Sequence, residues 1–215
     1  MYHLILLCRN EEGYRNLCYL DSCAFTEGFY IRPRIDKELL RQHAGGLIAL
    51  SACQSGEVPR RILAGDYEGA KAIALEMREL FGEDGYYLEL QDHNLPNDPA
   101  INQGLIRIHQ ETGIPLVVTN DAHYLRREDA QMQDTLMCIQ MGKTVDDPNR
   151  LKMETSELYV KSTEEMAALF PAYPEAVENT VKIAELCNMD FQFGTYHLPE
   201  FKLPEGYTDG DAYFE

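Results

Sequence analysis

The most informative segment of the chain reads Val117-Val118-Thr119-Asn120-Asp121-Ala122-His123-Tyr124. Its β-branched run predicts a buried strand, and Asp121 and His123 follow just past the carboxyl end, where parallel α/β folds place their ligands. A carboxylate and an imidazole two residues apart lie on the same side of an extended backbone and can bind Zn²⁺ or Mn²⁺ together. The alternative is an Asp that caps the next turn, with a His packed against it.

Two more apolar runs lead into side chains that can bind a metal. Residues 46–51 run into Cys53, whose thiolate could ligate a metal, although a buried inert cysteine is the commoner case. Residues 86–91 run into Asp92 and His93, and a single histidine is more often a core or surface residue than a ligand. Because three successive predicted strands end in such residues, together they indicate a metal site more strongly than any one does.

Short strand-like runs alternate with segments of helical period, and His3 opens the first run. Strands are predicted over residues 3–7, 46–51, 86–91 and 115–119. Helices are predicted over residues 66–81, 102–111, 128–141, 163–170 and 174–187, with another starting near Glu57. Strands that alternate with helices predict an α/β fold built on a parallel sheet or barrel.

The character of the sequence changes after Gly142. Residues 144–150 have turn composition, two helical patterns follow, and the tail from Gly194 is predicted to be irregular. We therefore predict two parts, an α/β domain over residues 1–143 and a linker with a mostly helical segment over residues 144–215.

Composition narrows the class of protein. The 215 residues are 45% hydrophobic, enough to bury a core, and no apolar stretch approaches the roughly 20 residues of a membrane helix, so we expect a cytoplasmic protein. The net charge of −17 opposes direct binding to a phosphate backbone. Six cysteines without a CxxC motif are expected to be reduced and mostly buried. The sequence has no phosphate-binding glycine loop, GxSxG elbow or HExxH motif.

Short motifs follow one another in an order that resembles bacterial polymerase III alpha subunits, the replicative C-family DNA polymerases. The motifs are His3-Leu4-Ile5-Leu6-Leu7, Glu27-Gly28-Phe29-Tyr30, Gly46-Leu47-Ile48-Ala49-Leu50-Ser51-Ala52-Cys53, Gly56-Glu57-Val58-Pro59, Glu89-Leu90-Gln91-Asp92-His93, Thr119-Asn120-Asp121-Ala122-His123-Tyr124, Asp146-Asp147-Pro148 and Ser162-Thr163-Glu164-Glu165-Met166. The resemblance covers nearly the whole chain, which makes it more specific than any single motif.

This resemblance implies that residues 1–143 are the C-terminal portion of a metal-binding, phosphoesterase-like PHP domain, a distorted β/α barrel. The family's metal-ligand positions match His3, Cys53, Asp121 and His123. They would hold Zn²⁺ or Mn²⁺ in an incomplete cluster, because the opening strands, with a His-x-His motif, are expected before Met1. His93 matches a residue near the site that is not a ligand. Residues 144–215 would lead toward the polymerase palm domain.

The resemblance also implies a function and partners. In the complete domain, the family associates the metal cluster with hydrolysis of phosphodiester bonds of the 3′–5′ exonuclease type. The parent would be a DNA-directed DNA polymerase that uses Mg²⁺, DNA and deoxynucleotides and binds other holoenzyme subunits, with no membrane partner, whereas this chain would be inactive by itself. Catalytic and substrate-binding residues are not assigned.

Two alternatives stay open. The first is a non-catalytic PHP module that stabilises the polymerase and binds partner subunits. The second is an unrelated metal-dependent hydrolase of barrel type that uses Asp121 and His123.

Overall fold

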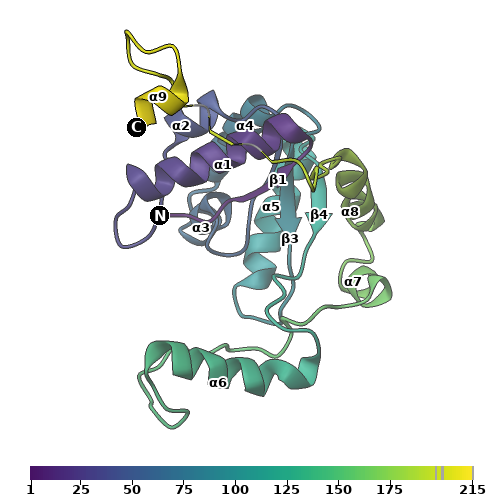
Figure 1. Cartoon of the computed structure of the whole chain (residues 1–215). Helices are drawn as coiled ribbons and strands as arrows, with labels where there is room; N and C mark the ends of the chain where they lie inside the picture. Colours follow the sequence, from purple (N-terminus) through teal and green to yellow (C-terminus); the bar gives the residue numbers. More distant parts are fainter. Residues whose placement is uncertain (197, 200, 215) are drawn as a thin grey trace.

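The four predicted strands form one sheet. A computed structural model describes residues 1–196, 198–199 and 201–214 of the chain. The strands, in the spatial order β1-β2-β3-β4, are β1 (Ile5–Cys8), β2 (Leu47–Leu50), β3 (Tyr86–Leu90) and β4 (Leu116–Val118). Helices pack on both faces of the sheet (Figure 1), which confirms the predicted α/β class.

Strand β1 is antiparallel to β2, whereas β2, β3 and β4 are parallel to one another. The prediction of a parallel sheet is therefore wrong for the first strand. The reason is that the connection between β1 and β2 starts and ends at the same edge of the sheet. The N–H of Arg9, just after β1, donates to the carbonyl of Gly46, just before β2, at 2.8 Å. Because the end of β1 meets the start of β2, the two strands run in opposite directions.

Two helices that the sequence analysis did not predict form this connection. Helix α1 (Glu11–Thr26) begins at Asn10, whose side chain accepts a hydrogen bond from the N–H of Gly13. Helix α2 (Lys37–Gln42) begins at Asp36, whose side chain accepts from the N–H of Leu39. Both are helix-start patterns with acidic residues in the first turn. The buried face of α1 consists of Gly13, Leu20, Cys23 and Ala24.

The remaining helices match the predicted ones, with one addition. They are α3 (Glu57–Leu63), α4 (Tyr67–Phe81), α5 (Asp98–Thr112), α6 (Ala130–Met141), α7 (Thr163–Leu169) and α8 (Pro174–Leu186). A 3-10 turn, Arg127–Asp129, precedes α6. The addition is α9 (Gly210–Phe214), where an irregular tail was expected. The side chain of Asp209 accepts a hydrogen bond from the N–H of Asp211 and so favours a helical turn there.

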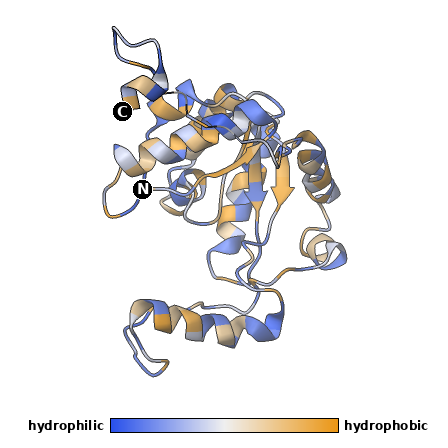
Figure 2. Ribbon diagram, viewed as in Figure 1, coloured by the Kyte–Doolittle hydropathy of each residue, from blue (hydrophilic) through white to orange (hydrophobic). Residues whose placement is uncertain are grey.

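Alternate strand residues pack into two hydrophobic layers. On one face, the completely buried Ala49 and Leu88 pack with side chains of α4 and α5. On the other face, Ile48 and Tyr87 pack with Ile183 of α8. Figure 2 shows the hydrophobic strands at the centre, between these helices. Burial on both faces explains why the strands read as continuous apolar runs.

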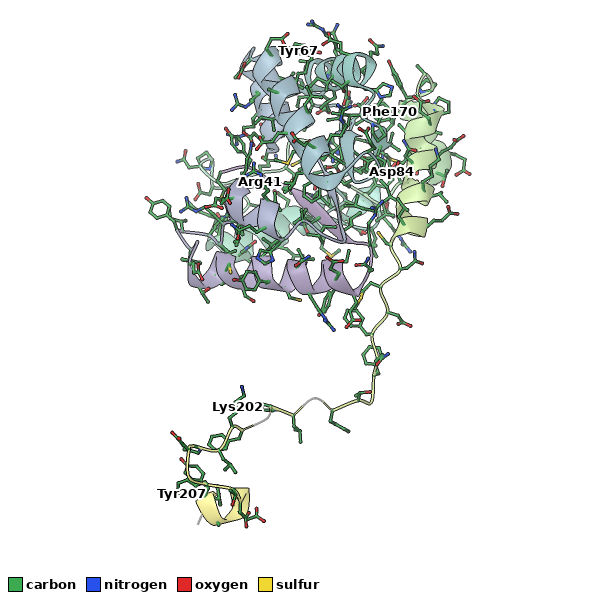
Figure 3. All side chains as sticks on the ribbon, turned by 90° about the horizontal axis from the view of Figure 1, so that it is seen from above. Arg41, Tyr67, Asp84, Phe170, Lys202 and Tyr207 are labelled. Atoms are coloured by element: carbon green, nitrogen blue, oxygen red, sulfur yellow. The ribbon has the colours of Figure 1, made fainter. Side chains whose placement is uncertain are left out.

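Two segments lie away from this core. Helix α6 extends from one end of the molecule (Figure 1), and its buried residue is Cys138. The segment after α8, which carries Lys202 and Tyr207, leads away from the body of the protein (Figure 3).

Two predictions from composition can be compared with the described residues. All six cysteines are free thiols there, as expected, but fewer are buried than expected: Cys23 and Cys138 are buried, Cys18 is exposed, and the other three are partly buried. Within the same residues, no helix combines the length and the apolar character that a membrane crossing requires.

Helix α8 packs on the sheet although it lies beyond residue 143, where we predict a domain boundary. The side-chain amide of Asn179 donates to the carbonyl of Leu116 in β4 at 2.7 Å. Ile183 lies in the hydrophobic layer on the same side. The boundary stays a prediction, and α8 contributes to the core of the sheet wherever that boundary falls.

Replacement of Ile183 by alanine should therefore destabilise the sheet. The Ile183 side chain is 6% exposed, so Ile183→Ala leaves a cavity and should lower the free energy of unfolding by about 2–5 kcal/mol. Val181→Ala is the matched control, because Val181 lies on the same helix and is 59% exposed; its effect should stay below about 0.5 kcal/mol. Urea unfolding followed by circular dichroism compares the two variants. Equal, small effects would show that α8 does not support the core.

Candidate metal centre

The antiparallel pairing of β1 brings His3 to the edge of the sheet where β2, β3 and β4 end. The N–H of His3 donates to the carbonyl of Ser55, in the turn after β2, at 3.0 Å. The Nδ1 atom of His3 lies 3.8 Å from Sγ of Cys53. His3 precedes its strand, but the start of β1 lies beside the end of β2 because the strands run in opposite directions. Two of the four predicted ligands are thus neighbours.

A tight turn of the backbone places Cys53. Ala52 has a φ of 64°, in the left-handed region that residues with a Cβ rarely adopt. Gly56 closes the turn, and a Cβ at this position would collide with the carbonyl oxygen of Ser51. The chain therefore folds back closely over the end of β2, and Cys53 lies within this fold-back.

The surroundings of Cys53 disfavour its ionised form when no cation is near. Burial raises the pKa of the Cys53 thiol, a backbone hydrogen bond at Ser55 lowers it, and the negative charges of Asp121 and Glu89 raise it again. A divalent cation would reverse this effect, because the thiolate is the form that binds metals.

Asp121 and His123 lie together in the loop after β4. Asp121 has a φ of 43°, again in the left-handed region. The Nδ1 atom of His123 lies 2.6 Å from the carbonyl oxygen of Asp121, so that nitrogen carries the proton. In this tautomer, Nε2 is the nitrogen of His123 that can bind a metal. The backbone N–H of His123 donates to the carbonyl of Leu158 at 2.8 Å, which fixes the loop.

The four predicted ligands do not form one compact cluster. Across the part of the chain that the structure describes, no group of three His, Cys, Asp or Glu side chains lies close enough to hold an ion. His3 and Cys53 make one pair, and Asp121 and His123 make another at a different strand end. The assignment of these residues as ligands stays a prediction.

Glu89 belongs to this edge, and the sequence analysis did not single it out. Its carboxylate accepts hydrogen bonds from the N–H of Ala52 and, at 2.8 Å, from the hydroxyl of Thr119. The side chain is buried, and burial raises the pKa of its carboxyl group. A signal was present in the sequence, because Glu89 is the charged residue of Tyr86–Leu90, an otherwise apolar strand, and buried charges require partners.

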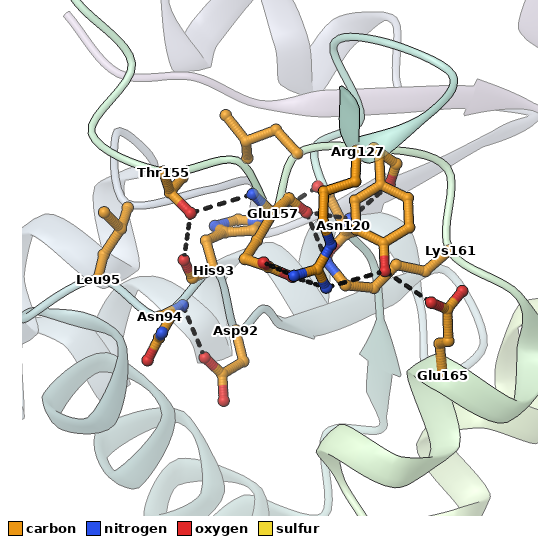
Figure 4. Close-up of polar contacts among 12 residues, drawn as sticks. Asp92, His93, Asn94, Leu95, Asn120, Arg127, Thr155, Glu157, Lys161 and Glu165 are labelled. Atoms are coloured by element: carbon orange, nitrogen blue, oxygen red, sulfur yellow. Dashed lines mark hydrogen bonds and ion pairs between the residues drawn. The ribbon is translucent and has the colours of Figure 1, made fainter. Parts of the chain in front are cut away.

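Asn120, next to Asp121, is held by a segment that returns after α6 (Figure 4). Its side-chain amide donates to the carbonyls of Glu157, at 2.8 Å, and Tyr159, at 2.7 Å. The Nε2 atom of His93 lies 3.1 Å from the carbonyl oxygen of Asn120. The ring of His93 is thus engaged with the backbone, a supporting role consistent with the expectation that it is not a ligand.

Glu157 in this network has one buried and one exposed cationic partner (Figure 4). The Nζ atom of Lys161 lies 3.4 Å from its carboxylate and also donates to Oδ1 of Asn120 at 3.1 Å. The Lys161 side chain is 3% exposed. Arg127 approaches the same carboxylate to 2.9 Å, but its side chain is 57% exposed.

Comparison with known proteins gives a family match for the first part of the chain. Residues 1–93 match the family model of the PHP domain. These residues include β1, β2 and β3, and with them the His3 and Cys53 pair.

The whole chain is similar to DNA polymerase III subunit alpha from several organisms. It is 49% identical over 212 residues to that of Treponema pallidum, 49% over 216 residues to that of Borreliella burgdorferi and 44% over 214 residues to that of Thermus aquaticus. These alignments cover 99%, 100% and 97% of the chain, but 18%, 19% and 18% of the relatives. The chain therefore spans about a fifth of the length of the curated relatives that it matches.

The two cationic partners of Glu157 should contribute unequally to stability. Lys161→Met leaves the Asn120 amide oxygen without its donor and removes the buried cation beside the Glu157 carboxylate, so the free energy of unfolding should fall by about 1–3 kcal/mol. Arg127→Met removes an exposed pair to the same carboxylate and should cost less than about 1 kcal/mol. Urea unfolding of both variants measures the difference, and a larger effect for Arg127→Met would contradict this account of the network.

Proposed function

We propose that this chain, which belongs to the family of DNA polymerase III alpha subunits, supplies the metal-binding edge of a PHP domain in a replicative DNA polymerase. The observation that carries the proposal is the contact between His3 and Cys53 at the edge where three parallel strands end. PHP domains and DNA polymerases are generally metal-dependent, and this edge offers the donor atoms that a metal needs.

The donor set fits Zn²⁺ or Mn²⁺. The thiolate of Cys53 and the imidazole of His3 are ligands that Zn²⁺ prefers, and the carboxylate of Asp121 suits both ions. When bound, a divalent ion would supply the positive charge that neutralises a phosphodiester and polarises its phosphorus–oxygen bonds.

The chain's own residues orient this set. The turn through Ala52 fixes Cys53 beside His3, and the hydrogen bonds of Asn120 fix the backbone next to Asp121. His123 keeps its proton on Nδ1, against the carbonyl of Asp121, which leaves the lone pair of Nε2 for a metal.

A groove beside β1 is the place where further strands of a PHP-type barrel would pack. Its volume is about 1100 Å³, and its walls include Leu6 of β1, Leu20 of α1 and Met77 of α4. The sheet of the described residues has four strands and is open at β1, so a closed barrel would need further strands beside it. We assign this groove to barrel strands supplied by a longer polypeptide of the kind found in the relatives.

The activity of the whole polymerase also belongs to the proposal. The complete PHP domain would hydrolyse phosphodiester bonds in the manner of a 3′–5′ exonuclease, and the parent protein would bind Mg²⁺, DNA, deoxynucleotides and other holoenzyme subunits in the cytoplasm. The net charge of −17 indicates that other parts of the protein make most of the contacts with DNA. A non-catalytic PHP module is the second candidate, favoured by the lack of a compact three-residue ligand group in the described residues.

Metal binding by the purified chain tests the proposal. We expect the wild type to bind about one Zn²⁺ or Mn²⁺ per chain and Cys53→Ala and Asp121→Ala to lose at least about tenfold in affinity, because the loss of a ligand should cost no less than the loss of a group that orients one. Cys18→Ala is the matched control, because Cys18 is an exposed cysteine on α1. Inductively coupled plasma mass spectrometry after equilibrium dialysis gives both stoichiometry and affinity.

The outcomes separate the two candidates. Binding that is lost in Cys53→Ala and Asp121→Ala but kept in Cys18→Ala supports a metal centre at the carboxyl edge. A wild type that retains no metal at millimolar free concentration would overturn the metal proposal and leave the structural PHP module.

A further inference from the structure

We propose that Glu89 is a positioning residue that sets the distance between Cys53 and Asp121. The inference rests on the proposed function, since it concerns the same edge of the sheet. Glu89 lies near the end of β3, the strand between β2, which leads to Cys53, and β4, which leads to Asp121. Its side chain connects these two outer strand ends.

The Glu89 carboxylate accepts one hydrogen bond from each of the two outer strand ends. One carboxylate oxygen of Glu89 accepts from the N–H of Ala52, the residue before Cys53. The other accepts from the hydroxyl of Thr119 at 2.8 Å, two residues before Asp121. The Thr119 oxygen in turn accepts from the side-chain amide of Gln91 at 2.7 Å. The ends of β2 and β4 are therefore tied to one rigid, buried group.

The backbone of Glu89 strengthens the link to β2. Its N–H donates to the hydroxyl of Ser51 at 2.8 Å, and Ser51 is itself buried. Ala52 adopts the left-handed region directly after Ser51, and its N–H donates to the side-chain carboxylate of Glu89 instead of to a backbone carbonyl of β3. Without an acceptor at position 89, that N–H would be buried and unpaired, so the turn that presents Cys53 depends on Glu89.

The same contacts distinguish Glu89 from a ligand. Both of its carboxylate oxygens already accept hydrogen bonds, and the residue is 4% exposed. Cys53, by contrast, is half-buried, and Asp121 is exposed. Groups that orient ligands in this way change metal affinity by about 10–100-fold when they are altered.

The test compares two substitutions of Glu89 by titration with Co²⁺, whose visible absorption and thiolate charge-transfer band report on coordination by Cys53. Glu89→Leu keeps the volume but removes both acceptors, so we expect Co²⁺ affinity to fall by about 10–100-fold and the charge-transfer band to weaken. Glu89→Gln keeps an acceptor for the N–H of Ala52 and should restore most of the affinity. Glu68→Gln, an exposed acid on α4, is the matched control.

A second readout does not need a metal. In the metal-free chain, the rate at which iodoacetamide alkylates Cys53 should differ at least threefold between Glu89→Leu and Glu89→Gln, which both lack the charge of Glu89 but of which only the second keeps an acceptor for Ala52; the exposed Cys18 serves as an internal reference whose rate stays constant. Peptide mass spectrometry measures both cysteines in one sample. Where circular dichroism shows that Glu89→Leu is unfolded, Thr119→Val replaces it, because this variant removes one of the two links and retains the other.

The two proposals fail in different ways. Wild-type binding of Co²⁺ together with unchanged affinity in Glu89→Leu and equal Cys53 alkylation in Glu89→Leu and Glu89→Gln would overturn the positioning role and leave the metal centre standing. A wild type that does not bind Co²⁺ would overturn the metal centre, and the alkylation rates would then decide whether Glu89 sets the geometry of this edge.

Discussion

The direction of β1 is the constraint on which the rest of the site depends. The hydrogen bond between Arg9 and Gly46 joins the end of β1 to the start of β2 and makes the pair antiparallel. With β1 parallel, His3 would lie at the opposite edge from Cys53, one strand length away. The antiparallel arrangement instead places an imidazole from the start of one strand beside a thiol from the end of the next.

Much of this arrangement could be predicted from the sequence. The positions of all four strands and most helices follow from apolar periodicity, and the placement of Cys53 and Asp121 after strands that end at the same edge of the sheet follows from the parallel direction of β2, β3 and β4. The direction of β1 could not be predicted, because the residues of a strand do not encode the strand's direction. That direction is set by long-range contacts, here by the hydrogen bond from Arg9 to Gly46 that closes the connection through α1 and α2.

Segments after residue 143 contact both the loop after β4 and the sheet. The loop after β4 has few partners within residues 1–143, and segment 155–161 returns to supply them through Asn120 and Lys161. Helix α8 covers the hydrophobic layer around Ile48, on the face of the sheet opposite to α4 and α5. No local pattern in the sequence predicts these contacts, because they join residues that are more than 30 positions apart. The geometry near Asp121 therefore depends on residues beyond 143 as well as on the sheet.

The carboxyl edge also concentrates features that cost stability. Ala52 and Asp121 both adopt left-handed conformations, each unfavourable by about 1 kcal/mol or more for a residue with a Cβ, and Glu89 is a buried carboxylate. These features are coupled, because the backbone N–H of Ala52 donates its hydrogen bond to the Glu89 carboxylate. A sheet that served only as support for a polymerase could remove both costs at once, with a regular strand end and an apolar side chain at position 89. The presence of strain and buried charge together, around the residues that could bind a metal, therefore favours a ligand-binding edge over a purely structural one.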